Sequence, residues 1–127
     1  MNVVDSSAWL EYFAGGPNAG FFAPAIEDQK ELLVPSVCLY EVFKLILREA
    51  GKKEAMEKAA AMRQGRVVDL TTSLALHAAS LSLKHQLAIA DSFVLATARA
   101  HHAILWTQDS DFQALSSVKY RKKRRAT

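Results

Sequence analysis

The sequence predicts a single α/β domain, a three-layer α/β/α sandwich around a central, mainly parallel sheet. Short apolar runs alternate with longer helix-like stretches, which is typical of a parallel sheet wrapped by helices. The apolar runs are continuous rather than alternating, as expected for strands that are covered on both faces. The chain has 127 residues and half of them are hydrophobic, so one domain with a substantial core is expected.

The first part of the chain predicts two strands and two helices. Residues 1–4 form an apolar run and are expected to be a buried strand. Ser6 or Ser7 then caps a helix that runs to residue 13, where the sequence Gly15-Gly16-Pro17 ends it. A second helix is expected over residues 19–29, although Pro24 leaves the position of its start open, and a strand is expected over residues 32–34.

The middle of the chain predicts two helices and a strand. Ser36 caps a long helix that reaches Ala50, and Gly51 terminates it. An alanine-rich helix follows over residues 52–64, and a strand is expected over residues 66–70.

The last part of the chain continues the alternation. Thr71 and Thr72 cap a helix that extends to about residue 84. The later elements are expected to be a helix over residues 91–102, a strand over residues 103–107, a short helix over residues 109–115 and an edge strand that begins at Val118.

Positive charge is concentrated at the end of the chain. Residues 119–127 hold six of the sixteen Lys and Arg residues and no acid, so residues 1–118 carry ten basic against thirteen acidic residues, a net charge of −3. We therefore expect a domain over residues 1–118 and a basic C-terminal tail over residues 119–127. Such a tail suits contact with a phosphate backbone, and a solvated end that aids solubility is the alternative.

The composition also predicts the compartment. The only cysteine is Cys38, so no intrachain disulfide can form, and a buried structural role is expected for its thiol. The sequence shows no secretory signal pattern and no apolar run of membrane-spanning length. A cytoplasmic protein without membrane contact is expected.

Acidic residues follow the predicted strands or lie just inside the next helix. The carboxyl ends of parallel strands meet at one edge of the sheet, where ligands bind. Carboxylates gathered there repel each other unless a cation neutralises them, and Mg²⁺ prefers such oxygen ligands. The candidate ligands are Asp5, Glu41, Asp91 and Asp109, with Asp111 close behind.

Asp5 and Asp91 also have structural interpretations. Asp5 could cap the first helix, although Ser6 and Ser7 could do so instead. Asp91 opens an apolar, alanine-rich helix and either caps it or binds a ligand at its N-terminus. That helix is expected to be internal, and burial of a bare charge is costly, which favours the ligand role.

Thr107 precedes two acids that are separated by one residue. Its hydroxyl could orient a carboxylate of the site. Either Asp109 or Asp111 could instead cap the short helix that follows. Asp109 is favoured as the metal ligand, and Asp111 remains the alternative.

Glu41 lies in a helix beside apolar residues, where a solvated surface position is the alternative to a ligand role. Lys44 and Arg48 share its side of the helix. These two residues could be surface partners of Glu41 or could hold a nucleic-acid phosphate near the metal.

Four motifs in this order resemble those of the PIN-domain ribonucleases, and specifically the VapC-type toxins of bacterial and archaeal toxin–antitoxin pairs. The resemblance covers nearly the whole chain. The motifs are Val4-Asp5-Ser6-Ser7, Glu41 in its helix, Ala90-Asp91-Ser92 with Ala96-Thr97-Ala98, and Thr107-Gln108-Asp109-Ser110-Asp111-Phe112.

The resemblance implies a PIN-like fold and a divalent-metal endoribonuclease. The usual acids of the family fall on Asp5, Glu41, Asp91 and Asp109, with Ser6 and Thr107 as polar support. One or two Mg²⁺ or Mn²⁺ ions would polarise an RNA phosphodiester and activate water. The resemblance further implies a homodimer and a small cognate antitoxin protein.

Two other functions were weighed. A phosphotransfer receiver domain would use Asp69 as its phosphate acceptor, but no acidic neighbour of Asp5 completes the usual metal pair. A PIN-like module that binds RNA or protein without cutting is the other alternative. The four histidines are scattered along the predicted helices and are expected to be structural or surface residues.

The helix over residues 36–50 carries more apolar surface than one core face needs. Tyr40, Phe43, Ile46 and Leu47 could form a dimer interface, receive an antitoxin helix, or be covered by the next helix.

Overall fold

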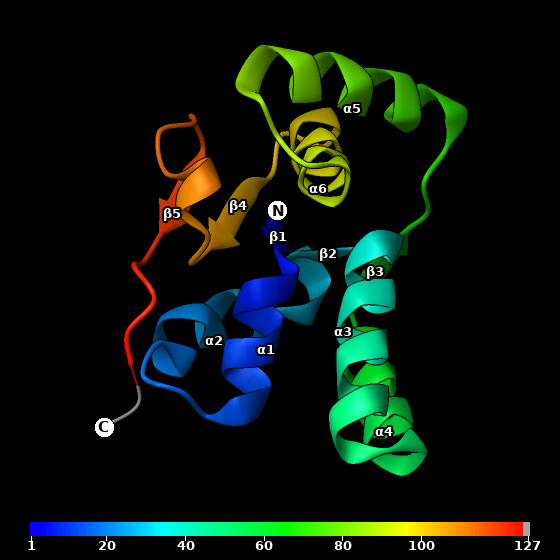
Figure 1. Ribbon diagram of the computed structural model, residues 1–127, viewed down its shortest axis with the longest axis vertical. Coiled ribbons are helices and arrows are strands. Elements are labelled where there is room, and N and C mark those ends of the chain that lie inside the picture. The colour runs from blue at the N-terminus through cyan, green and yellow to red at the C-terminus, as the bar shows by residue number, and fades with distance from the viewer. Residues whose placement is uncertain (126–127) are drawn as a thin grey trace.

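The computed structural model describes residues 1–125 and shows three layers, with a parallel sheet between helices (Figure 1). The predicted α/β/α sandwich is therefore confirmed. Residues 126 and 127 of the predicted basic tail lie outside the described residues. The strands are β1 (Asn2–Val4), β2 (Leu32–Pro35), β3 (Arg66–Val68), β4 (Ile104–Thr107) and β5 (Val118–Tyr120).

All five strands are parallel, in the order β3-β2-β1-β4-β5. The central strand β1 pairs Val3 with Leu33 of β2 and with Leu105 of β4. These three side chains are almost completely buried, which explains why the central strands are continuously apolar. Strand β5 continues past residue 118 to Tyr120, so the first residues of the basic segment belong to the sheet.

Helices α5 and α6 lie on one side of the sheet and helices α1 and α2 on the other (Figure 1). The helices are α1 (Ser6–Ala14), α2 (Ala19–Glu27), α3 (Ser36–Ala50), α4 (Lys52–Met62), α5 (Thr72–His85) and α6 (Ile89–Ala100), with 3₁₀ helices η1 (Gln29–Glu31) and η2 (Ser110–Phe112).

Three element boundaries differ from the sequence prediction in ways that affect the site. Helix α6 begins at Ile89, which places Asp91 in its first turn and not at its start. The short helix expected over residues 109–115 is reduced to the 3₁₀ helix η2. The strand expected over residues 66–70 ends at Val68, so Asp69 lies beyond the sheet.

The core forms between the sheet and both helix layers. Trp9 and Phe22 fill one side of the sheet and Leu95 the other, each with almost no exposed surface. Cys38 is fully buried, as expected for a structural thiol. Among residues 1–125, no helix is both long and apolar enough to cross a bilayer.

Candidate metal centre

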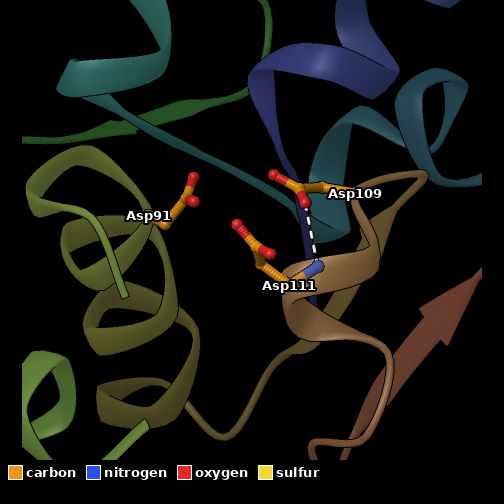
Figure 2. A group of neighbouring side chains, drawn as sticks. All are labelled: Asp91, Asp109 and Asp111. Carbon is orange, nitrogen blue, oxygen red and sulfur yellow. Dashed lines mark hydrogen bonds between the residues drawn. The ribbon is translucent and has the colours of Figure 1, made fainter. Parts of the chain in front are cut away.

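Three acids converge at the carboxyl edge of the sheet. Asp109 follows β4, Asp111 lies in η2 and Asp91 lies in the first turn of α6. One carboxylate oxygen from each lies within 4.8 Å of the others, and the three side chains point toward a common space (Figure 2). These elements come together because α6 packs against β4 and η2 follows β4 directly in the chain.

Asp5 is both a helix cap and a member of this site. It is the N-cap residue of α1, and its Oδ1 accepts hydrogen bonds from the backbone N–H of Ala8 (3.0 Å) and the hydroxyl of Ser7 (2.9 Å). Its Oδ2 accepts a bond from Thr107 Oγ1 (2.7 Å). The prediction that Ser6 or Ser7 caps this helix was wrong, because both serines lie inside α1.

Burial makes the charge of Asp5 costly. The residue is only 4% exposed, and this burial raises its pKa to about 6, against the opposing effect of its hydrogen bonds and with a smaller contribution from Asp109. Asp5 lies outside the 4.8 Å group of Asp91, Asp109 and Asp111. Its charge nevertheless helps to raise the pKa of Asp91.

Thr107 connects the two central strands at the site. Its hydroxyl donates to Asp5 and accepts a hydrogen bond from the backbone N–H of Asp109 (2.9 Å). Asp109 Oδ1 in turn accepts from the N–H of Asp111 (2.9 Å) and caps η2. One buried hydroxyl therefore fixes the positions of two carboxylates, and Asp109 combines capping with a place in the cluster.

Asp91 does not cap its helix. The N-cap of α6 is Ala88, without a side-chain bond, and no hydrogen bond from residues 1–125 reaches the Asp91 carboxylate. Burial raises its pKa most, the charges of Asp109, Asp5, Glu41 and Asp111 add to this in that order, and together they bring it to about 7. The charge of Asp91 is therefore opposed by all four other acids of the site.

Glu41 reaches the site from α3. Its Oε1 accepts a hydrogen bond from Ser6 Oγ (2.6 Å), which joins α3 to α1. Ser6 thus supports Glu41, whereas Ser7 supports Asp5. The contribution of Ser7 was not predicted, since its sequence position suggested only an alternative cap.

The predicted basic partners of Glu41 contact other residues. Lys44 donates to the hydroxyl of Tyr40 (3.3 Å) and Arg48 pairs with Glu49 (3.2 Å). Both cations are exposed, and their binding of RNA stays a prediction. Within the described part of the chain, none of the five site carboxylates has a lysine, arginine or histidine within 4.0 Å.

This donor set fits a divalent cation. It offers carboxylate oxygens only, which are the ligands that Mg²⁺ and Mn²⁺ prefer. The mutual repulsion that raises the pKa of Asp91 is the interaction that a bound cation would remove. Asp69 is exposed beyond the edge strand β3 and takes no part in the cluster.

A buried amide network behind the site was also missed. Gln108 lies between Thr107 and Asp109, and its Nε2 donates to the carbonyl of Ser7 (3.4 Å). Its Oε1 accepts a bond from Asn18 Nδ2 (3.1 Å). Both amides are buried. The sequence offered no signal for a contact between residues so far apart.

Comparison with known proteins identifies the family and the fold. A family model described as PIN domain matches residues 3–117. No curated protein matches the chain significantly.

Several solved structures share the fold. A toxin–antitoxin complex from Klebsiella pneumoniae is similar with a TM-score of 0.78 and 19% identity, over 94% of this chain and 96% of that one. VapC20 of Mycobacterium tuberculosis, a Sarcin-Ricin loop cleaving toxin, has a TM-score of 0.74 and 24% identity, over 91% and 95% of the two chains. VapBC2 from Rickettsia felis, bound to a promoter DNA fragment, has a TM-score of 0.73 and 12% identity, over 95% and 97%. At these identities the likeness establishes the fold.

Proposed function

This chain belongs to the PIN-domain family, and from that premise we propose that it is a divalent-metal-dependent endoribonuclease and the toxin of a toxin–antitoxin pair. The observation that carries the proposal is the convergence of Asp91, Asp109 and Asp111 beside Asp5 and Glu41, with no cationic side chain from residues 1–125 paired to them. Structural neighbours described as a toxin–antitoxin complex and as a Sarcin-Ricin loop cleaving toxin support it. The receiver-domain alternative has no support, because Asp69 lies outside the cluster.

In the proposed site, Asp91 and Asp109 hold the cation, with Asp5, Glu41 and Asp111 completing its oxygen environment. A bound Mg²⁺ or Mn²⁺ supplies Lewis-acid activation of the phosphodiester and of the attacking water. Thr107 holds Asp5 and Asp109 in register, and Ser6 orients Glu41. Glu41, which reaches the site from the separate helix α3, would bind the cation directly or through water, or position the attacking water.

The proposed partners are RNA, a small cognate antitoxin and a second copy of the chain, in the cytoplasm. Helix α3 exposes Tyr40 (62%) and Leu47 (43%). These side chains, with Leu39, Phe43 and Ala59, line a groove of about 450 Å³ between α3 and α4. The next helix therefore covers only part of the apolar surface of α3, and the remainder is available to a partner.

The test is cleavage of end-labelled total cellular RNA by the purified protein with Mg²⁺, Mn²⁺ or EDTA. Asp91→Asn should abolish metal-dependent cuts, whereas the matched control Asp69→Asn, an exposed acid outside the cluster, should retain them. Cuts that persist in EDTA or in folded Asp91→Asn protein would refute the proposed site. Metal binding without cleavage of any RNA would favour the non-catalytic PIN-like module.

A further inference from the structure

The basic strap, which we define as residues 119–125, forms an ordered row of unneutralised cations. It contains six basic residues and no acid, and all six are exposed. Within residues 1–125, no carboxylate lies within 4.0 Å of any of them. The six are Lys119, Arg121, Lys122, Lys123, Arg124 and Arg125.

Hydrogen bonds hold the basic strap against the body of the protein. Strand β5 ends in register with Thr107, whose carbonyl accepts a bond from the N–H of Arg121 (3.0 Å). The carbonyl of Lys122 then accepts a bond from Asn18 Nδ2 (2.9 Å). Arg124 donates from Nε to Asn18 Oδ1 (3.2 Å) and from Nη2 to the carbonyl of Pro17 (2.8 Å). The strap consequently runs from β5 past α2 (Figure 1).

The strap contacts the turn over residues 15–18, whose conformation depends on Glu11. Asn18 is only 1% exposed, and its backbone N–H donates to Glu11 Oε2 (2.7 Å). Gly16 packs so closely that an added Cβ would lie 2.5 Å from Glu11 Oε1. Since a larger residue would displace the Glu11 carboxylate, the sequence fixes the position of Asn18 and with it the course of the strap.

The cations of the strap divide into two groups. Lys119 stacks on the ring of Trp106 (4.6 Å) and Arg121 on that of Phe21 (4.4 Å), so aromatic contacts hold these two. The side chains of Lys122, Lys123 and Arg125 make no hydrogen bond, ion pair or aromatic contact with residues 1–125. They are the charges left for a ligand.

We propose that the basic strap is a docking surface for the phosphate backbone of single-stranded RNA. A fixed row of like charges repels itself, and a polyanion with regularly spaced charges relieves that repulsion. The first residues of the strap lie beside Thr107, whose carbonyl accepts the N–H of Arg121 and whose hydroxyl positions Asp5 and Asp109, so bound RNA begins beside the metal site. The identity of the ligand rests on the proposed ribonuclease function.

The charges that line the groove beside the strap are consistent with a phosphate ligand. Lys123, Arg124 and Arg125 line one side of a groove of about 980 Å³ whose other side is the turn after α1. Glu11 is the only acid that residues 1–125 contribute to that lining, and it is largely buried and bonded to Asn18. The groove therefore presents an excess of positive charge to an entering phosphate.

The test compares two triple variants that lose the same charge. Lys122→Ser, Lys123→Ser and Arg125→Ser together remove the three free cations and leave every docking contact in place. The control carries Lys30→Ser, Lys52→Ser and Lys53→Ser, which are exposed cations elsewhere on the surface. Binding of a labelled mixed-sequence single-stranded RNA is measured in EDTA between 0.05 and 0.3 M salt, so that cleavage does not interfere.

Loss of three phosphate contacts should make the plot of log association constant against log salt concentration less steep, by about 2 in slope. At 0.1 M salt it should weaken RNA binding ~100-fold. The control variant should change neither. Equal slopes in the two variants would overturn the docking surface. Poly-glutamate that binds as tightly as RNA, with the same dependence on the strap, would instead identify an acidic protein as the partner and overturn RNA.

A charge-conserving variant tests the ordered geometry. Arg124→Lys keeps the charge but loses the two-pronged contact with Asn18 and Pro17, and it should weaken RNA binding severalfold. Unchanged binding would show that charge alone matters, which contradicts an ordered surface. Cleavage activity reports separately on the proposed function, because metal-dependent cuts with an unchanged salt slope would refute only the strap. A strap-dependent slope without cleavage would refute only the nuclease.

Discussion

Replacing the buried carboxyl of Asp5 by an amide should make the metal-free protein more stable at alkaline pH. Asp5→Asn preserves the shape of the side chain and an oxygen that can accept the capping bond from Ala8. It removes a negative charge that is 4% exposed and lies beside four other acids. The change therefore separates the cost of that charge from the value of the helix cap.

The magnitude follows from the pKa of Asp5. Its rise from the ordinary value of 3.8 to about 6 corresponds to about 3 kcal/mol of folding free energy. Because the folded-state pKa is raised, the stability contributed by the acid is fully present below pH 3.8 and is lost as pH rises through about 6. About 2 kcal/mol of that loss falls between pH 4.5 and 8, and the Asn variant lacks it.

The assay is urea unfolding in EDTA at pH 4.5, 6 and 8, with Asp69→Asn as a control for an exposed acid. The free energy of unfolding of Asp5→Asn, relative to wild type, should increase by about 2 kcal/mol from the lowest to the highest pH. With Mg²⁺ at 100 times its dissociation constant, wild type should gain about 2.7 kcal/mol, and Asp5→Asn much less. Parallel pH profiles for wild type and Asp5→Asn would refute the claim that burial of this charge opposes folding.

Three other predictions concern the same region. Thr107→Val leaves the N–H of Asp109 without its acceptor and should cost about 1–3 kcal/mol in urea unfolding, whereas Thr107→Ser should cost less; equal losses would contradict the role of the hydroxyl. The pKa of Asp5 is raised to about 6 and that of Asp91 to about 7, mainly by burial, so Mg²⁺ should bind more tightly as pH rises from 5 to 8 and should release protons on binding. Calorimetry in buffers of different ionisation enthalpy detects these protons, and a Mg²⁺ affinity that does not change with pH would contradict the prediction. Burial raises the pKa of the Cys38 thiol, so a thiol reagent should label it only at the rate of unfolding, and rapid labelling of the folded protein would show that the thiol is accessible.

The alternation of strands and helices could be predicted from the sequence because it is a local property. Buried parallel strands need continuous apolar runs, and the caps and stops at Thr71 and Gly51 are single-residue signals. The start of α6 was harder to predict from the sequence. The apolar residues before Asp91 suggested that the helix starts at the acid, but the backbone turns at Ala88. That shift leaves the Asp91 carboxylate free of capping and available to the cluster.

The site could be predicted only as a set of acids, because its hydrogen bonds join residues distant in sequence. Ser6 reaches Glu41 across 35 positions and Thr107 reaches Asp5 across 102. Which serine supports which acid depends on how α1 packs against α3 and β4, and no local pattern encodes it. The same limit applies to the contact between Asn18 and Gln108.

Asp5 has both of the roles that the sequence suggested as alternatives, because the same carboxylate caps a helix and lies in the acidic site. Its Oδ1 caps α1 while its Oδ2 holds Thr107, which in turn positions Asp109. The fold therefore secures a charged group in a buried position by giving it structural hydrogen bonds, and these bonds oppose the effect of burial on its pKa. Asp91 has no such bonds among the described residues, and the other acids raise its pKa further. Of the two, Asp91 is the acid whose charge depends most on a bound cation.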